Sequence, residues 1–198
     1  MSATRRLVAI MFTDIQGYTK LMQESEAKAV RVRTRHRSIF EPTTLTFGGE
    51  IIQYYGDGTL SIFSSTVDAV KCAIEMQSAF QKEPLIPVRI GIHTGDILIS
   101  DQDIIGDSVN VASRIESLGI AGSITLSKKV ADELINHEAF SLKSLGKFHF
   151  KNDRTPREVF EAVITDSLSN RDDGHRLWTT LSIHQASHSS DQSKTQTK

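Results

Sequence analysis

Two aspartates stand at positions where a carboxylate is expected to do chemistry. Asp14 follows the continuous apolar run of residues 7–12, and Asp57 lies between two glycines in a turn. An apolar run without alternation is typical of a strand covered on both faces. If that strand lies beside the turn, the two carboxylates meet, and such a pair suits magnesium or manganese. The alternative for Asp57 is a turn-forming role alone, since Asp-Gly is a standard turn pair.

The residues after Asp14 form a candidate phosphate-binding loop. Ile15 to Thr19 are expected to turn into a helix, and Gly17 allows a ligand to approach the backbone closely. Backbone N–H groups at the start of a helix attract phosphate.

A third group of candidates lies on a later predicted helix. Asn110 and Arg114 are four residues apart and therefore share one helix face, whereas Val111 and Ile115 point to the core. An arginine beside a carboxamide is suited to hold the charge that develops on a phosphate. The alternative is a solvated arginine and an asparagine on the helix surface.

The elements that must position these residues follow the order β-α-β-β-α-β between residues 7 and 126. This order predicts an α+β fold with a ferredoxin-like split βαβ core, a mostly antiparallel sheet with helices on one face, and an added helix and β-hairpin. Pro42 is expected to bend or end the first long helix, which starts at Ser25. In the strand before Asp57, alternation predicts that Ile51, Gln53 and Tyr55 share one face. The expected elements are strands at 7–12, 50–55, 59–63, 88–93, 123–126, 140–150 and 158–164, and helices from 25, at 65–80, at 109–116 and from 127 to about 137.

Composition narrows the class of protein. The net charge of -1 gives no sign of a nucleic-acid partner, and Cys72 is the only cysteine among 198 residues, which excludes an internal disulfide. The sequence has neither an apolar run long enough for a membrane span nor a signal-peptide pattern, so a cytoplasmic location is expected. We predict one folded domain over residues 5–165 and a polar, disordered tail over residues 166–198.

Four segments together resemble the class III nucleotide cyclases, the catalytic domains of adenylyl and guanylyl cyclases of bacterial type. The segments keep the order and spacing of that family, and the resemblance extends from about residue 7 to residue 164. They are Phe12–Thr19, Tyr55–Gly58, Arg89–Gly95 and Gly106–Arg114. The resemblance implies an enzyme, a phosphorus-oxygen lyase that makes a 3′,5′-cyclic nucleotide and pyrophosphate from a nucleoside triphosphate.

The resemblance also implies roles for individual residues. Asp14 and Asp57 correspond to the two metal-binding aspartates and the Ile15 carbonyl to a backbone ligand, for two magnesium or manganese ions per active site. Asn110 corresponds to the residue that orients the ribose, and Arg114 to the residue that stabilises the α-phosphate. Gly17, Tyr18 and Thr19 fall in the segment that binds the phosphates, and Lys151 corresponds to the lysine that holds the terminal phosphates.

The residues at the base-selecting positions favour ATP as the substrate. Asp103 is the residue expected for adenine, but Gln53 stands where adenylyl cyclases of this family commonly have lysine. An amide can donate to adenine and can also flip to serve guanine, so a guanylyl or dual-specificity cyclase is the alternative. A catalytically silent nucleotide-binding module is the other alternative, although it would be expected to have lost one of the aspartates, Asn110 or Arg114.

The resemblance further implies a head-to-tail homodimer. Metals and base pocket would come from one subunit, and Asn110 and Arg114 from the other. The segment between Gly95 and Asp103 is short for an arm that wraps a partner, so dimer affinity is expected to be low. The sequence leaves any regulator unidentified.

Overall fold

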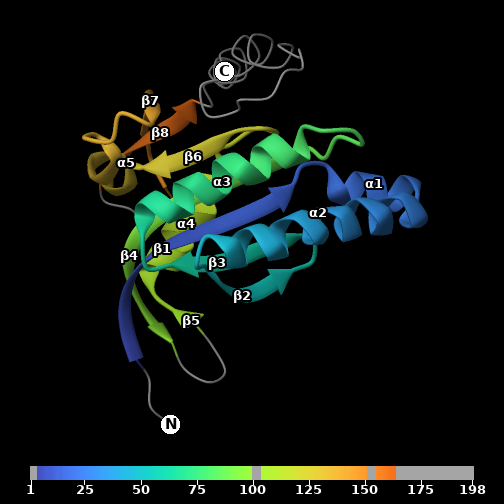
Figure 1. Cartoon of the computed structure of the whole chain (residues 1–198), viewed down its shortest axis with the longest axis horizontal. Helices are drawn as coiled ribbons and strands as arrows, with labels where there is room; N and C mark the ends of the chain where they lie inside the picture. The colour runs from blue at the N-terminus through green and yellow to red at the C-terminus, as the bar shows by residue number, and fades with distance from the viewer. Residues whose placement is uncertain (1–3, 100–103, 151–154, 164–198) are drawn as a thin grey trace, which may run out of the picture. The chain divides into compact units, whose positions relative to one another are not determined.

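The computed structural model describes residues 4–99, 104–150 and 155–163 (Figure 1). Within these residues the chain forms one sheet and five helices, and none of those helices is long and apolar enough to cross a membrane. The strands are β1 (Thr4–Ile15), β2 (Glu50–Tyr55), β3 (Gly58–Phe63), β4 (Val88–Ile99), β5 (Ile104–Ile105), β6 (Ile124–Ser127), β7 (Ser141–Phe148) and β8 (Arg157–Val163). The helices are α1 (Tyr18–Glu24), α2 (Glu26–Thr46), α3 (Thr66–Phe80), α4 (Asp107–Ser117) and α5 (Lys128–Leu134).

The sheet has eight strands in the order β2-β3-β1-β4-β6-β8-β7, with β5 paired to the end of β4. Strand β1 lies between β3 and β4 and is antiparallel to both. Among the described strands only the β4–β6 pair is parallel. The predicted α+β class, the order of the elements and the mostly antiparallel sheet are therefore confirmed.

The helices cover both faces of the sheet, and the prediction that they lie on one face was wrong. Helices α1, α2, α3 and α5 pack with Ala9 and Met11 of β1, whereas Ala112 of α4 packs with Val8 and Ile10 on the opposite face. Gly91 permits this arrangement, because a Cβ there would lie 2.3 Å from the Cα of Glu116. The backbone of α4 thus rests directly on β4, a close approach that no larger residue would allow.

Helix α2 continues past Pro42 to Thr46. The proline therefore does not end the helix, which was one of the two predicted effects. Phe40 and Thr44, on either side of the proline, are both buried. Tertiary packing of this helix side offsets the loss of one backbone hydrogen bond. The predicted start is confirmed, since the Ser25 hydroxyl accepts from the Lys28 N–H at 3.4 Å.

A β-bulge in β2 overturns the predicted alternation of its side chains. Ile51 pairs with Ser61 and Gln53 with Leu60, so one extra residue, Ile52, lies between two consecutive pairs. Directly opposite residues of an antiparallel pair share a face. Gln53 therefore lies on the face of Leu60, away from Ile51, because the extra residue shifts the period of two.

Candidate functional site

Asp14 and Asp57 lie together, as the sequence predicted. Asp14 is next to last in β1, and Asp57 lies in the turn between β2 and β3. Burial raises the pKa of the Asp57 carboxyl, and the charge of Asp14 raises it further. The backbone N–H groups of Asp57 and Ile15 donate to the same carboxyl and partly oppose the rise of its pKa. Two hard oxygen donors that repel each other in this way fit a divalent cation.

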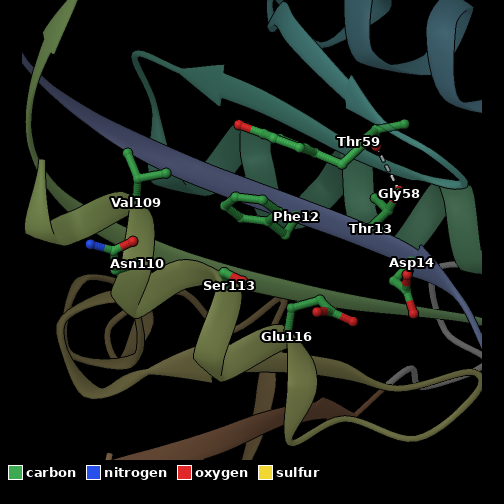
Figure 2. A pocket seen from close by; sticks show the side chains of 10 residues that line it. Phe12, Thr13, Asp14, Gly58, Thr59, Val109, Asn110, Ser113 and Glu116 are labelled. Carbon is green, nitrogen blue, oxygen red and sulfur yellow. Dashed lines mark hydrogen bonds between the residues drawn. The ribbon is translucent and has the colours of Figure 1, made fainter. Parts of the chain in front are cut away.

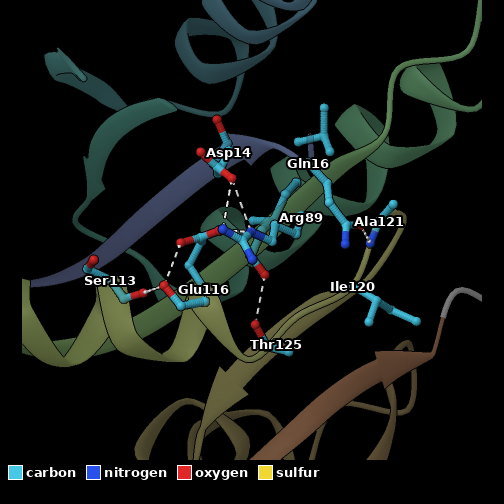
Figure 3. Close-up of polar contacts among 12 residues, drawn as sticks. Asp14, Gln16, Arg89, Ser113, Glu116, Ile120, Ala121 and Thr125 are labelled. Atoms are coloured by element: carbon cyan, nitrogen blue, oxygen red, sulfur yellow. Dashed lines mark hydrogen bonds and ion pairs between the residues drawn. The ribbon is translucent and has the colours of Figure 1, made fainter. Parts of the chain in front are cut away.

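Asp14 also contacts Arg89, a residue that sequence reasoning missed. Arg89 lies directly opposite Asp14 in the β1–β4 ladder, and its Nε and Nη2 lie 3.1 Å and 2.9 Å from the Asp14 Oδ2. The Arg89 Nε also lies 2.5 Å from the Oε1 of Glu116 on α4. Figure 3 shows the guanidinium between the two carboxylates. The side chain of Glu116 is 7% exposed, and burial raises its pKa to about 6 although Arg89 lowers it.

One cavity of about 400 Å³ joins the end of β1 to helix α4 (Figure 2). Its volume is in the range of small-molecule sites. Asp14 and Asn110 both line it, so the structure brings these two predicted site residues together within one chain. The other lining residues are Phe12, Thr13, Tyr55, Gly58, Thr59, Val109, Ser113 and Glu116.

Arg114 is half-buried on α4 and does not line this cavity. The helix presents Asn110, Ser113 and Glu116 to it instead, which are spaced three residues apart. Within the described part of the chain, no group of three or more acidic, histidine or cysteine side chains is arranged to hold a metal. The predicted metal ligands Asp14 and Asp57 form a pair of carboxylates, not a larger cluster.

The loop before α1 has the backbone geometry expected of it, but one of its side chains has a different place. Gly17 has a φ of 81°, the left-handed region that favours glycine, and it precedes the first turn of α1. Tyr18 is 8% exposed and belongs to the main hydrophobic cluster. Its side chain is therefore placed in the core, which leaves only its backbone N–H for a phosphate. Neighbouring Gln16 is held by two backbone groups, since its N–H donates to the Pro87 carbonyl and its Oε1 accepts from the Ala121 N–H.

Two predicted residues, Asp103 and Lys151, lie outside the described residues. Gln53 is described and exposed near the end of β2. It shares its sheet face with Leu60. The cavity lies on that face, where the rings of Tyr55 and Phe12 stack with their centroids 6.1 Å apart. The bulge in β2 therefore turns Gln53 toward the face of the sheet that the cavity occupies.

A buried polar network lies directly beneath Asp14. The hydroxyl of Thr13 is 2.6 Å from that of Thr59 and 3.0 Å from the Nε2 of His36. The imidazole is fully buried and stacks on the rings of Phe40 and Phe80. Burial lowers the pKa of His36 from 6.5 to about 4, and the charge of Arg37 adds to this effect. The histidine is therefore neutral at physiological pH and fixes the strand end that carries Asp14.

This lowered pKa predicts a loss of stability in acid. Between pH 6.5 and about 4 the unfolded chain takes up a proton at His36 that the folded chain does not. The stabilisation is complete above pH 6.5, and the free energy of unfolding should fall by about 1 kcal/mol per pH unit below it for this one group. Buried His93, whose pKa is also lowered to about 4, acts in the same direction, while Glu116 opposes both because its pKa is raised.

Urea unfolding at pH 7.5, 6, 5 and 4.5 measures the effect, with His36→Gln as the comparison. The variant should be less stable at neutral pH, because its side chain packs less well between Phe40 and Phe80. Its stability should nevertheless depend less steeply on pH, since one titrating group is gone. Equal slopes for the two proteins would contradict a buried neutral His36.

The sequence matches a known protein family and several known proteins. Residues 2–164 match the family model described as the adenylate and guanylate cyclase catalytic domain. The chain is 32% identical over 167 residues to putative adenylate cyclase 3 of Rhizobium meliloti (strain 1021), covering 80% of this chain and 28% of that protein. It is also 32% identical over 172 residues to the adenylate cyclase of Anabaena cylindrica, covering 74% of this chain and 34% of that protein. The chain thus spans about a third of the length of these curated relatives.

Solved structures agree with this match. The adenylate/guanylate cyclase/hydrolase from Silicibacter pomeroyi is 35% identical and superposes with a TM-score of 0.76, covering 82% of this chain and 99% of that one. The adenylyl cyclase CyaB from P. aeruginosa is 25% identical with a TM-score of 0.75, covering 88% of this chain and 100% of that one. The whole length of each of these solved chains is therefore represented in this fold.

Proposed function

This chain belongs to the class III nucleotide cyclases, and we propose that it converts ATP to 3′,5′-cyclic AMP and pyrophosphate. It contains a nucleotide cyclase catalytic domain with adenylate cyclase homologues. The observation that supports the chemistry most is the pairing of Asp14 and Asp57, which the end of β1 and the β2–β3 turn bring together. Chemistry on a nucleoside triphosphate needs such oxygen ligands for the cations that accompany its phosphates.

Asp14, Asp57 and the Ile15 carbonyl are the proposed ligands of two magnesium or manganese ions. Burial and the charge of Asp14 raise the pKa of the Asp57 carboxyl, and a cation bound between the two carboxylates would oppose both effects. When bound, such ions supply activation of the ribose 3′-hydroxyl and neutralise charge on the leaving pyrophosphate. The protein contributes the fixed arrangement of the two carboxylates, which the β1 end and the β2–β3 turn hold together.

Asn110 and Arg114 are the proposed transition-state residues. The Asn110 amide can hold the ribose so that its 3′-oxygen faces the α-phosphorus, which lowers the entropy cost of the in-line attack. The Arg114 guanidinium can donate to the α-phosphate oxygens, whose negative charge grows as the new bond forms. An interaction that strengthens only at that point raises kcat more than substrate affinity.

The phosphate and base subsites complete the proposal. The backbone N–H groups around Gly17 and Thr19, at the start of α1, are proposed to contact the phosphates, with Lys151 on the terminal ones. Gln53 and Asp103 are proposed to read the purine. Asp103 accepts from the exocyclic amine of adenine but meets the O6 acceptor of guanine, and this mismatch favours ATP.

We propose that the working unit is a head-to-tail homodimer in which each site takes Asn110 and Arg114 from the second copy. Arg114 does not line the cavity beside Asp14 in its own chain, which supports a role for it in another copy. Because one chain contains a full set of the proposed residues, two identical copies would form two sites.

Substitution of Gln53 by Lys tests the base subsite. A lysine at this position can donate to adenine N1 but cannot flip to serve guanine, so Gln53→Lys should raise the ratio of ATP to GTP turnover on the order of tenfold. The measurement compares cyclic AMP and cyclic GMP formed with Mn²⁺ at equal nucleotide concentrations. Gln81→Lys, on the surface after α3, is the matched control for the added charge and should leave the ratio unchanged.

If the wild-type protein forms cyclic GMP faster than cyclic AMP, ATP is not the preferred substrate and the chain is a guanylyl cyclase. Nucleotide binding without either product would instead support the silent regulatory module. An unchanged ratio in Gln53→Lys would separate this residue from base selection.

A further inference from the structure

We propose that Arg89, held in place by Glu116, is a positioning residue that aims one oxygen of Asp14 at the cation site. The inference rests on the proposed role of Asp14 as a metal ligand. It assigns to Arg89 of β4 and Glu116 of α4 the role of orienting that ligand. Its consequence is that the Arg89–Glu116 pair sets how tightly the site binds a divalent cation.

The two oxygens of Asp14 have separate neighbours. Both contacting nitrogens of Arg89 reach the same oxygen, Oδ2, at 2.9 Å and 3.1 Å. The other oxygen, Oδ1, is turned toward the β2–β3 turn, where a Cβ added to Gly58 would lie 3.7 Å from it. Asp57 occupies that same turn. The guanidinium therefore holds one oxygen while the second faces the other proposed ligand.

Arg89 is itself fixed from two sides. Its strand position opposite Asp14 is set by the β1–β4 ladder, and its Nε contacts the buried Glu116 at 2.5 Å (Figure 3). Glu116 cannot move away easily, because the backbone of α4 rests on Gly91 at that residue. The Arg89 guanidinium, with the carboxylates of Asp14 and Glu116 on its two sides, therefore has few alternative positions. Asp14 is thus oriented by a chain of contacts that ends in a helix packed on the sheet.

The Arg89–Glu116 pair allows the effect of orienting the Asp14 carboxylate to be measured separately from the effect of changing the charge around it. Arg89 contributes one positive charge and Glu116 one negative charge, so removing both leaves the net charge around Asp14 unchanged. Loss of the guanidinium alone would also remove a cation that repels a metal ion, and the two effects would oppose each other. The double substitution Arg89→Met with Glu116→Gln removes the contacts to Asp14 without that electrostatic change.

The experiment measures binding of Mn²⁺ alone by electron paramagnetic resonance of the free ion, without nucleotide and without turnover. We expect the double variant to bind Mn²⁺ about 10- to 100-fold more weakly than wild type, the usual cost of losing a residue that orients a metal ligand. The matched control is Arg6→Met with Glu50→Gln, which removes an exposed Arg–Glu pair that also starts on β1. The control should bind Mn²⁺ as wild type does.

Thermal unfolding of the same proteins separates positioning from a structural role. If the pair only ties α4 to the sheet, the double variant will unfold at a lower temperature but bind Mn²⁺ with wild-type affinity, and this result would overturn the inference. Should the double variant not fold, Arg89→Lys replaces it. A single ammonium retains the charge but cannot repeat the guanidinium contacts to both carboxylates, so weaker Mn²⁺ binding is again expected and wild-type affinity would overturn the inference.

The failure of this inference can be told apart from failure of the proposed function. If the wild-type protein binds no Mn²⁺ and Asp14→Asn behaves in the same way, Asp14 is not a metal ligand. Both the proposed function and the role of Arg89 then fail. Wild-type binding that Asp14→Asn abolishes, but that the double variant leaves unchanged, would overturn the role of Arg89 alone.

Discussion

Replacement of Asp57 by Asn is expected to lower kcat for cyclic AMP formation at least about a hundredfold. The amide fits the same turn but has no charge, so the proposed site loses half of its anionic ligands. Burial raises the pKa of this carboxyl and Asp14 raises it further, and a bound cation would oppose both effects. Assays of purified protein with Mn²⁺ and ATP, following both cyclic AMP and pyrophosphate, measure the effect.

Removal of the repulsion with Asp14 should leave Asp57→Asn at least as stable as wild type in urea unfolding. Loss of activity with retained stability is the pattern of a functional rather than a structural carboxylate. Asp132→Asn is the control, since it makes the same chemical change in an exposed helix pair with Lys128. Full activity in Asp57→Asn would reduce this residue to the turn-forming role.

Two inactive variants are expected to restore activity to each other when mixed. Arg114→Ala should lower kcat about a hundredfold, because it removes charge stabilisation at the transition state. In a mixture with Asp57→Asn, a mixed dimer has one site with the intact Asp57 of one copy and the intact Arg114 of the other. If subunits exchange at random, half of the dimers are mixed and each has one intact site, so about a quarter of wild-type activity should return.

The mixing experiment also decides how the cavity is used. In one chain Asn110 and Asp14 already line the same cavity, so a site within a single copy is the geometric competitor of a shared site. A single-copy site predicts no recovery, because each variant would lack one of its own essential residues. Native mass spectrometry of the mixture, with one variant carrying a mass tag, verifies that subunits have exchanged before a lack of recovery is accepted.

Patterns local in sequence predicted most of the fold. The apolar run before Asp14, the turn around Asp57 and the helix predicted at 65–80 each depend on a few neighbouring residues, and the structure has the elements in the predicted order. The proximity of Asp14 and Asp57 followed from that order, because β1 lies beside β3.

Features set by distant contacts were not predictable from local patterns. The extra residue in β2 becomes visible only through its pairing with β3, and it moves Gln53 to the opposite face from Ile51. Packing of α4 on the second face depends on Gly91, which in the sequence looks like any glycine in a strand. Arg89 and Glu116 are 27 residues apart and meet only because of that packing. The alternating strand 88–93 predicts only that Arg89 lies on the face opposite Val88 and Ile90, and it does not indicate the partners of this arginine.

Synthesis of cyclic AMP in a site shared between two copies of this chain can be tested in a single assay. Purified protein is incubated with Mn²⁺ and either ATP or GTP over a series of protein concentrations, and product per milligram is measured. We expect cyclic AMP to exceed cyclic GMP, and specific activity with ATP to rise with protein concentration as dimers form. Absence of cyclic AMP at micromolar protein would rule out the proposed activity, and a specific activity that is constant on dilution to monomer would rule out a site shared between copies.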